Sequence, residues 1–405
     1  MTNTEASITK GHLPTLIASF MHFDISFALW VLVGALGVFI GESLHLTPAA
    51  KGLMVAIPIL SGAILRVPLG LLSDRVGGKR VGITMLVFLY LPLFLGWRFA
   101  ADLPALLIMG LMLGTAGASF AVALPLASRW YPAKRQGLVM GVAAAGNSGT
   151  VIANLAAPRM ANLVGWHNVF ALAMIPLTVV LVAFVLMAKD NQSSTAGQPV
   201  ASYLSSLKQG EMWWFCLFYT VTFGGYVGLS SFLPLFFRDQ YHVSPATAGY
   251  ITALAALVGS TVRPLGGYLS DRIGGVRILT AVLSGIALTY LLGSRLPGLG
   301  TMVPILLVSM TCLGMGNGAV FQLVPLRFPK QIGIATGVVG AIGGLGGFLL
   351  PALLGSAKQV SGSFSGAFIV LALIAGAALL SLRLVSSTGR HAARSMVPAE
   401  QVVGD

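Results

Sequence analysis

The sequence predicts an all-α integral membrane protein with twelve transmembrane helices, arranged as two pseudo-symmetric halves of six helices each. Three observations support this fold class: an apolar composition, a series of long apolar segments and an internal repeat. Of the 405 residues, 56% are hydrophobic and only 9% are charged. A soluble domain carries about 25% charged residues, because a globule needs a polar surface. The composition therefore favours a chain that lies largely within a bilayer.

The apolar segments are long enough to cross a membrane. A transmembrane helix needs about 20 apolar residues to cross a hydrocarbon layer about 30 Å thick. By this criterion the predicted spans cover residues 14–40, 50–72, 82–100, 103–128, 137–161, 166–188, 211–238, 246–270, 277–294, 299–326, 331–357 and 362–385.

A polar stretch separates the sixth predicted span from the seventh. We therefore expect an N-terminal six-helix half at residues 1–188, a cytoplasmic linker at 189–210, a C-terminal six-helix half at 211–385 and a cytoplasmic tail at 386–405. The tail is short and basic, and we expect it to be disordered.

The net charge of +13 follows the topology of a membrane protein. Cytoplasmic loops carry an excess of Lys and Arg. Most of the 24 such residues fall on the side of the two termini, and six fall in the opposite loops: Lys51, Arg98, Arg159, Arg238, Arg295 and Lys358. Both termini are therefore predicted to be cytoplasmic, in a multi-pass protein of the inner (cytoplasmic) membrane. The partner that this charge pattern indicates is the lipid bilayer and not nucleic acid.

The two halves repeat one another in sequence. Residues 66–80 read RVPLGLLSDRVGGKR and residues 263–277 read RPLGGYLSDRIGGVR, with nine of fifteen positions identical at an offset of 197. A second pair, KRQGLVMGV from Lys134 and KQIGIATGV from Lys330, repeats at an offset of 196. A parallel duplication of this kind places a substrate site near the middle of the membrane, between the halves.

Two arginines occupy equivalent positions inside the second span of each half. Arg66 and Arg263 each precede the Asp of the following loop by eight residues, which places them about 12 Å from the cytoplasmic end of the helix. The pseudo-symmetry makes them face each other across the central path. Two unpaired guanidinium groups repel, and an anion between them would relieve that repulsion. Arginine also offers a planar fork suited to oxyanions. Alternatively, each arginine pairs locally or braces a helix.

Asp24 is the one acidic residue well within a span. Membrane carboxylates often serve proton relays, so Asp24 is a candidate proton carrier. It is equally a candidate counter-charge for one arginine, or a hydrogen-bonded partner of a neighbouring helix.

No pattern in the sequence indicates an enzyme. There is no Walker A sequence, no metal-spaced Cys/His cluster and no acid/base pair. Cys216 and Cys312 lie alone in apolar segments and are interpreted as packing residues. We expect no enzymatic activity, no cofactor and no metal site.

The loop between the second and third spans resembles the cytoplasmic loop motif of the major facilitator superfamily, G-x-x-x-D-R-x-G followed by basic residues. The matching residues are Gly70, Asp74 and Arg75 in the first half and Gly267, Asp271 and Arg272 in the second. The resemblance implies the major facilitator fold. It also implies that these loops brace the two halves and gate the cytoplasmic side.

Further segments resemble the nitrate/nitrite porter branch of that superfamily. They are the glycine-rich stretches from Gly141 and Gly337, the segment from Gly314 to Pro325, and the Tyr219–Phe223 pair. The resemblance implies substrate contacts from Arg66, Arg263, Asn147, Tyr219, Phe120 and Phe223, and helix sliding at Gly141, Gly146, Gly149, Gly340, Gly343 and Gly344.

The expected function is secondary active transport of nitrate and/or nitrite by alternating access, as proton symport or nitrate/nitrite exchange. We expect a monomer to be the functional unit. Two alternatives remain open from the sequence. One is a carrier of another small monoanion such as a short carboxylate, and the other is a membrane receptor that senses the anion without moving it.

Overall fold

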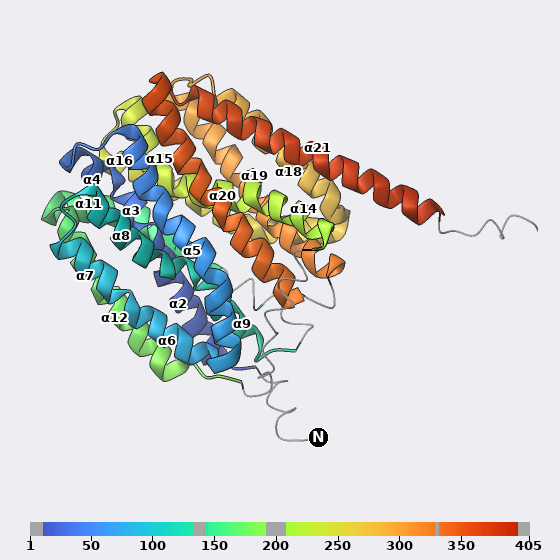
Figure 1. Ribbon diagram of the computed structural model, residues 1–405, viewed down its shortest axis with the longest axis horizontal. Helices are drawn as coiled ribbons and strands as arrows, with labels where there is room; N and C mark the ends of the chain where they lie inside the picture. Colours follow the sequence, from blue (N-terminus) through green and yellow to red (C-terminus); the bar gives the residue numbers. More distant parts are fainter. Residues whose placement is uncertain are drawn as a thin grey trace, which may run out of the picture.

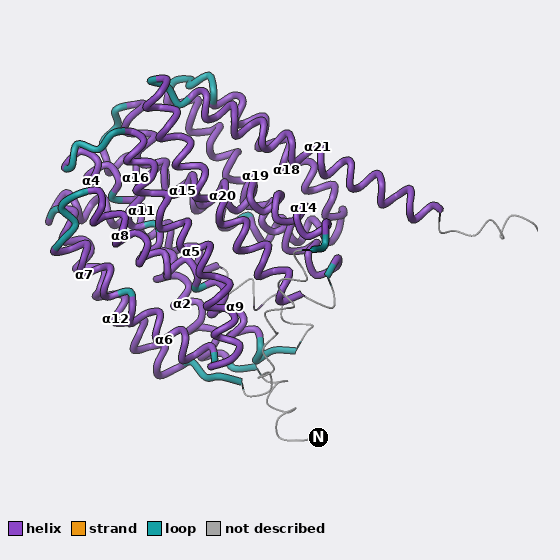
Figure 2. The backbone as a smooth tube through the Cα atoms, viewed as in Figure 1, coloured by secondary structure: helices purple, strands orange, loops and turns teal. Residues whose placement is uncertain are grey.

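The computed structural model describes residues 11–132, 139, 143, 145–191, 208–328 and 332–395. Every regular element in this part of the chain is helical, and short loops connect the helices (Figure 2). We call the helices up to residue 187 the N-half and those from residue 210 the C-half. Figure 1 shows the two halves side by side.

The elements of the N-half are α2 (Leu13–Trp30), α3 (Leu32–Ala35), α4 (Gly37–Ser43), α5 (Pro48–Val76), α6 (Gly78–Phe88), α7 (Tyr90–Arg98), α8 (Leu103–Leu113), η1 (Gly114–Ala118), α9 (Phe120–Ser128), η2 (Ala145–Ser148), α11 (Gly149–Val164) and α12 (Trp166–Met187).

The elements of the C-half are α14 (Gly210–Tyr219), η4 (Thr220–Gly224), α15 (Gly225–Tyr241), α16 (Pro245–Thr261), α17 (Arg263–Leu269), η5 (Ser270–Gly274), α18 (Gly275–Gly293), α19 (Leu299–Arg327), α20 (Ile332–Ser361) and α21 (Ser365–Ser395).

The described helices overlap all twelve predicted spans. Ten helical stretches in the described residues are long and apolar enough to cross a membrane. One of them, Pro245–Gly293, has 49 residues and contains the eighth and ninth predicted spans. The fifth predicted span begins outside the described residues and continues as η2 and α11, which is 16 residues long. The last predicted span ends where the apolar stretch Ser365–Val385 ends. The helix α21 itself continues to Ser395, so the expectation of a disordered tail is wrong for residues 386–395.

The repeat in sequence is also a repeat in local structure. Thr47 and Ser244 cap α5 and α16 with their side-chain oxygens, and a proline follows each cap. Proline suits the first helical position because its missing N–H would be unpaired there anyway. Gly77 and Gly274 turn the chain after the motif with φ of 105° and 101°. That backbone region favours glycine, which explains why both copies of the motif carry glycine there.

The halves meet along α5 and α20, which run side by side through the centre (Figure 1). Glycines allow this approach: a Cβ at Gly52 would lie 2.5 Å from the Pro351 carbonyl, and one at Gly355 would lie 2.5 Å from the Pro48 carbonyl. We call the side where α5 begins the opposite side, and the side where α2 begins and α5 ends the terminus side.

Two ion pairs join the halves on the opposite side. Lys51 Nζ lies 2.9 Å from Asp239 Oδ1, and Arg238 Nε lies 2.7 Å from Glu42 Oε1. On the terminus side, the ion pairs among the described residues stay within one half.

Candidate anion-binding site

Arg66 is buried at the interface of the halves and is held by backbone carbonyls. Its side chain is 3% exposed. Nε donates to the Gly117 carbonyl of the same half at 3.1 Å, and one terminal nitrogen donates to the Gly340 carbonyl of the C-half at 2.6 Å. The other terminal nitrogen is buried and has no hydrogen-bond partner among the residues that the structure describes. Arg66 therefore bridges the halves and keeps one N–H group for a further acceptor.

Three aromatic rings surround the Arg66 guanidinium. Its carbon lies 4.8 Å from the ring centre of Phe223, 5.4 Å from that of Trp30 and 5.6 Å from that of Phe120. Cations at these distances are attracted to the electron-rich ring faces. The rings thus offset part of the cost of burying a charge for which the described residues supply no acidic partner.

Arg263 begins α17 in the C-half and is only half-buried. Its guanidinium carbon lies 5.7 Å from the ring centre of Phe321, and it interacts with the Tyr219 hydroxyl. One of its terminal nitrogens is buried, and no described residue gives it a hydrogen-bond partner. The position of Arg263 in the C-half is equivalent to that of Arg66 in the N-half, at the offset of 197 residues.

A continuous aromatic cluster connects the two arginines. Tyr219 stacks on Phe223 with ring centres 4.9 Å apart and an interplanar angle of 2°. Phe321 meets Tyr219 edge-on at 4.8 Å, and it reaches Phe120 of the N-half at 6.0 Å. The cluster therefore forms an apolar wall that both guanidinium groups share.

Irregular helical turns position several of these groups. The Gly117 carbonyl belongs to a 3₁₀ turn, η1, and Phe223 belongs to a π turn, η4. Such turns inside longer helices are frequent at functional sites and hinges. Asn147 lies in a second 3₁₀ turn, η2, and is 2% exposed with no partner for its side-chain oxygen. No hydrogen bond or ring contact in the described part of the chain joins Asn147 to either arginine.

Two of the predicted helix-sliding glycines of α20 contact the site directly. A Cβ at Gly343 would lie 2.3 Å from Tyr219 Cδ1, and one at Gly344 would lie 2.8 Å from the Ala63 Cβ. Gly340 supplies the carbonyl that Arg66 contacts. Gly146 and Gly149 lie elsewhere, against the backbone of Asp24 in α2, and Gly141 lies outside the described residues.

Asp24 is a hydrogen-bonded partner of a neighbouring helix. Its Oδ1 accepts from the Ser148 hydroxyl at 2.5 Å. None of the four ion pairs among the described residues includes Asp24, so it is not paired with either arginine in this state.

The two motif loops differ in their contacts. Asp74 forms an ion pair with Arg129 at the end of α9. Asp271 is exposed and takes part in no ion pair within the described residues, and Arg272 lies 4.8 Å above the Tyr268 ring. Gly70 packs near Ala121 and Gly267 near the Gly318 carbonyl. Within the described residues, no group of three or more His, Cys, Asp or Glu side chains could hold a metal ion.

The predicted substrate contacts did not include four contributors to the site: Trp30, Phe321 and the carbonyls of Gly117 and Gly340. Trp30 contacts Arg66, and its indole nitrogen donates to the Pro58 carbonyl at 2.8 Å. A tryptophan within an apolar span carries no signal that separates it from a packing residue. The carbonyls of Gly117 and Gly340 are backbone groups, which no side-chain pattern identifies.

Sequence and structure comparisons identify the family of the chain. The family model described as Major Facilitator Superfamily matches residues 18–351. The chain belongs to the Major Facilitator Superfamily. Two solved structures share its fold. A bacterial homologue of the human lysosomal transporter Spinster has a TM-score of 0.70 at 18% identity, covering 92% of this chain and 96% of its own. The nucleoside transporter NupG has a TM-score of 0.73 at 12% identity, covering 91% and 99%.

Curated relatives identify the branch of the superfamily. The nitrite extrusion protein of Bacillus subtilis is 35% identical over 91% of this chain and 93% of its own length. The probable nitrate/nitrite antiporter NarK1 of Thermus thermophilus is 33% identical over 92% and 91%. This major facilitator chain is therefore a member of the nitrate/nitrite porter branch, which confirms the resemblance of its motifs.

Proposed function

We propose that the protein transports nitrate and/or nitrite across the membrane by alternating access. The observation that carries this proposal is the pair of buried guanidinium nitrogens, one on Arg66 and one on Arg263, for which the described residues supply no hydrogen-bond partner. A buried charged donor without an acceptor is costly. One anion between the halves would supply an acceptor to both nitrogens, and the names of the relatives supply its identity.

The chemistry of the site suits a small flat oxyanion. A planar guanidinium can present two parallel N–H groups to two oxygens. The aromatic wall formed by Tyr219, Phe223, Phe321 and Phe120 suits a planar, weakly hydrated monoanion. A dianion would require more donors than this wall provides.

Movement of the halves would expose the site to each side in turn. The ion pairs from Lys51 and Arg238 hold the halves together on the opposite side. We infer that this side is extracytoplasmic, that both termini are cytoplasmic, and that these pairs form the outer gate. We also infer that residues 1–188 and 211–385 move as the two rocking units of a functional monomer, joined by the 189–210 linker.

Transport in proteoliposomes tests the proposal. Purified full-length protein is reconstituted, and nitrate and nitrite uptake is measured with and without trapped nitrite and with and without an inward proton gradient. Saturable flux of either anion, lost in Arg66→Lys, is the expected result, and competition by formate or acetate measures selectivity against carboxylates. No flux of nitrate or nitrite under any condition would overturn the substrate.

The same experiment separates the two coupling modes and assigns Asp24. Uptake that requires trapped nitrite and ignores the proton gradient means exchange, and Asp24→Asn then keeps most activity. Uptake driven into empty vesicles by protons, and lost in Asp24→Asn, means symport with Asp24 as the carrier. Ser148→Ala is the control, because it removes the hydrogen bond to Asp24 and leaves the carboxyl group in place.

A further inference from the structure

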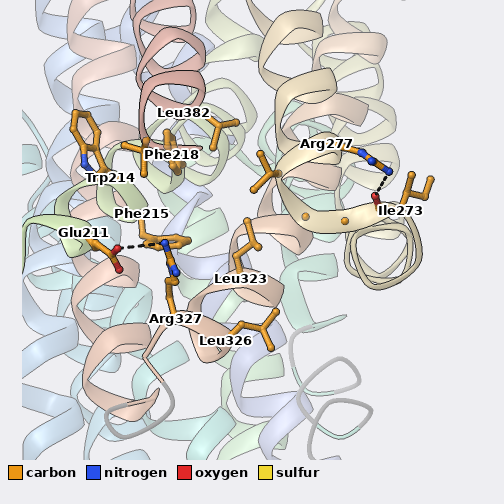
Figure 3. Close-up of a pocket in the computed structure, with 14 residues that line it drawn as sticks. Glu211, Trp214, Phe215, Phe218, Ile273, Arg277, Leu323, Leu326, Arg327 and Leu382 are labelled. Atoms are coloured by element: carbon orange, nitrogen blue, oxygen red, sulfur yellow. Dashed lines mark hydrogen bonds and ion pairs between the residues drawn. The ribbon is translucent and has the colours of Figure 1, made fainter. Parts of the chain in front are cut away.

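A large apolar cavity lies in the C-half, away from the two arginines of the candidate site. Its volume is about 740 Å³, within the range of roughly 300–1,000 Å³ typical of small-molecule sites. Helices α14, α18, α19 and α21 line it (Figure 3). Phe215, Phe218 and Leu382 are buried beneath it, whereas Leu326 is 67% exposed. The cavity is therefore an apolar cleft that opens on the outer surface of the bundle.

The position of the cleft places it at one membrane boundary. It lies at the beginning of α14 and α18 and at the end of α19, which is the terminus side. Trp214 lines it and is 37% exposed, as is common for tryptophan at the level of lipid headgroups. In a membrane-spanning chain, the apolar molecule next to such a cleft is a lipid.

The charged side chains at the cleft select the headgroup. Arg327 ends α19 and contributes to the lining, and its side chain is 53% exposed. Its partner is Glu211, 3.3 Å away and 52% exposed (Figure 3). Such an exposed pair contributes little stability, so a phosphate can compete for the arginine. Arg277 at the start of α18 adds a second positive charge and donates to the Ile273 carbonyl at 3.3 Å.

We propose that this cleft binds an anionic phospholipid of the leaflet on the terminus side. The acyl chain lies over Phe215, Phe218 and Leu382, and the headgroup phosphate binds Arg327 in place of Glu211. Basic pockets between transmembrane helices are suited to such headgroups. Phe218 of the cleft directly precedes Tyr219 of the candidate transport site in α14, and Phe215 packs against Phe328 after α19.

Two variants at the ion pair should change lipid binding in opposite directions. Native mass spectrometry of the purified full-length protein measures binding of phosphatidylglycerol and phosphatidylcholine without nitrate, so the result is independent of transport. Arg327→Gln should weaken phosphatidylglycerol binding roughly tenfold, since a charge-assisted contact is lost. Glu211→Gln should strengthen it, because the competing carboxylate is removed. Arg277→Gln should weaken it less.

Arg80→Gln is the matched control, because Arg80 occupies the position of Arg277 in the repeat of the N-half and does not line the cleft. It should leave lipid binding unchanged. Equal binding of phosphatidylcholine, or equal effects of Arg327→Gln and Arg80→Gln, would overturn the proposal. Complete displacement of phosphatidylglycerol by inorganic phosphate would overturn it too, since the site would then take a free oxyanion.

Discussion

The two halves place an arginine at the same position of one motif but surround it differently. Arg66 is fully buried, held by two carbonyls and enclosed by three rings. Arg263 is half-buried beside one ring and the Tyr219 hydroxyl. The motif loops differ in the same sense, because Asp74 is paired and Asp271 is exposed. The duplication thus supplied two cations in different surroundings. We call Arg66, which is enclosed, the anchor, and Arg263, which is less constrained, the arm.

The largest effect should come from the anchor. Arg66→Lys keeps the charge but loses the planar fork that reaches both the Gly117 and Gly340 carbonyls. Losing two charge-assisted hydrogen bonds at a buried site should reduce nitrate uptake roughly 100-fold or more. The measurement is initial uptake in proteoliposomes, normalised to the amount of reconstituted protein. Retention of wild-type uptake would show that the anchor is dispensable.

The arm should tolerate the same change better. Arg263→Lys removes contacts with one ring and one hydroxyl, and we expect a loss of roughly tenfold. Measured in the same vesicles, this value and that of Arg66→Lys give the asymmetry directly. Equal losses in the two variants would remove the distinction between anchor and arm.

Glycines of α20 also test the difference between the two arginines, because α20 carries the Gly340 carbonyl that Arg66 contacts. Gly343→Ala places a Cβ 2.3 Å from the Tyr219 ring, and the overpacking should lower uptake about fivefold. Gly340→Ala is the matched control on the same helix, since the nearest atom to its Cβ is 3.9 Å away and its carbonyl remains available to Arg66. A similar loss of uptake in both variants would mean that α20 is sensitive to any added methyl group. The contact with Tyr219 would then not explain the effect of Gly343→Ala.

The smallest effects should come from the motif loops. Asp74→Asn breaks the ion pair with Arg129 and should reduce uptake about two- to threefold, because a partly exposed pair contributes about 1 kcal/mol or less. Asp271→Asn breaks no ion pair with a described residue and should leave uptake unchanged within error. The two variants compared side by side test whether the loops diverged as the arginines did. A larger loss of uptake in Asp271→Asn than in Asp74→Asn would contradict the conclusion that the first loop makes the more important contact.

The sequence predicted the features that follow from hydropathy and repetition. Apolar segment lengths predicted the spans, and the offset of 197 residues predicted that Arg66 and Arg263 occupy equivalent positions in the two halves. The contacts that distinguish the two arginines were not predictable, because backbone carbonyls, the π turn at Phe223 and the ring of Trp30 depend on packing between distant helices. The role of Asp24 stayed open for the same reason: its partner, Ser148, lies 124 residues away.

In the proposed site one anion is held by both arginines at once, and a double-mutant cycle measures whether they share it. Equilibrium binding of nitrate is measured by calorimetry for the purified wild type, Arg66→Lys, Arg263→Lys and the double variant. If both side chains contact one anion, the two losses in binding free energy should not add, and the double variant should lose much less than their sum. Losses that add fully would mean that the arginines act independently, and would contradict a shared site.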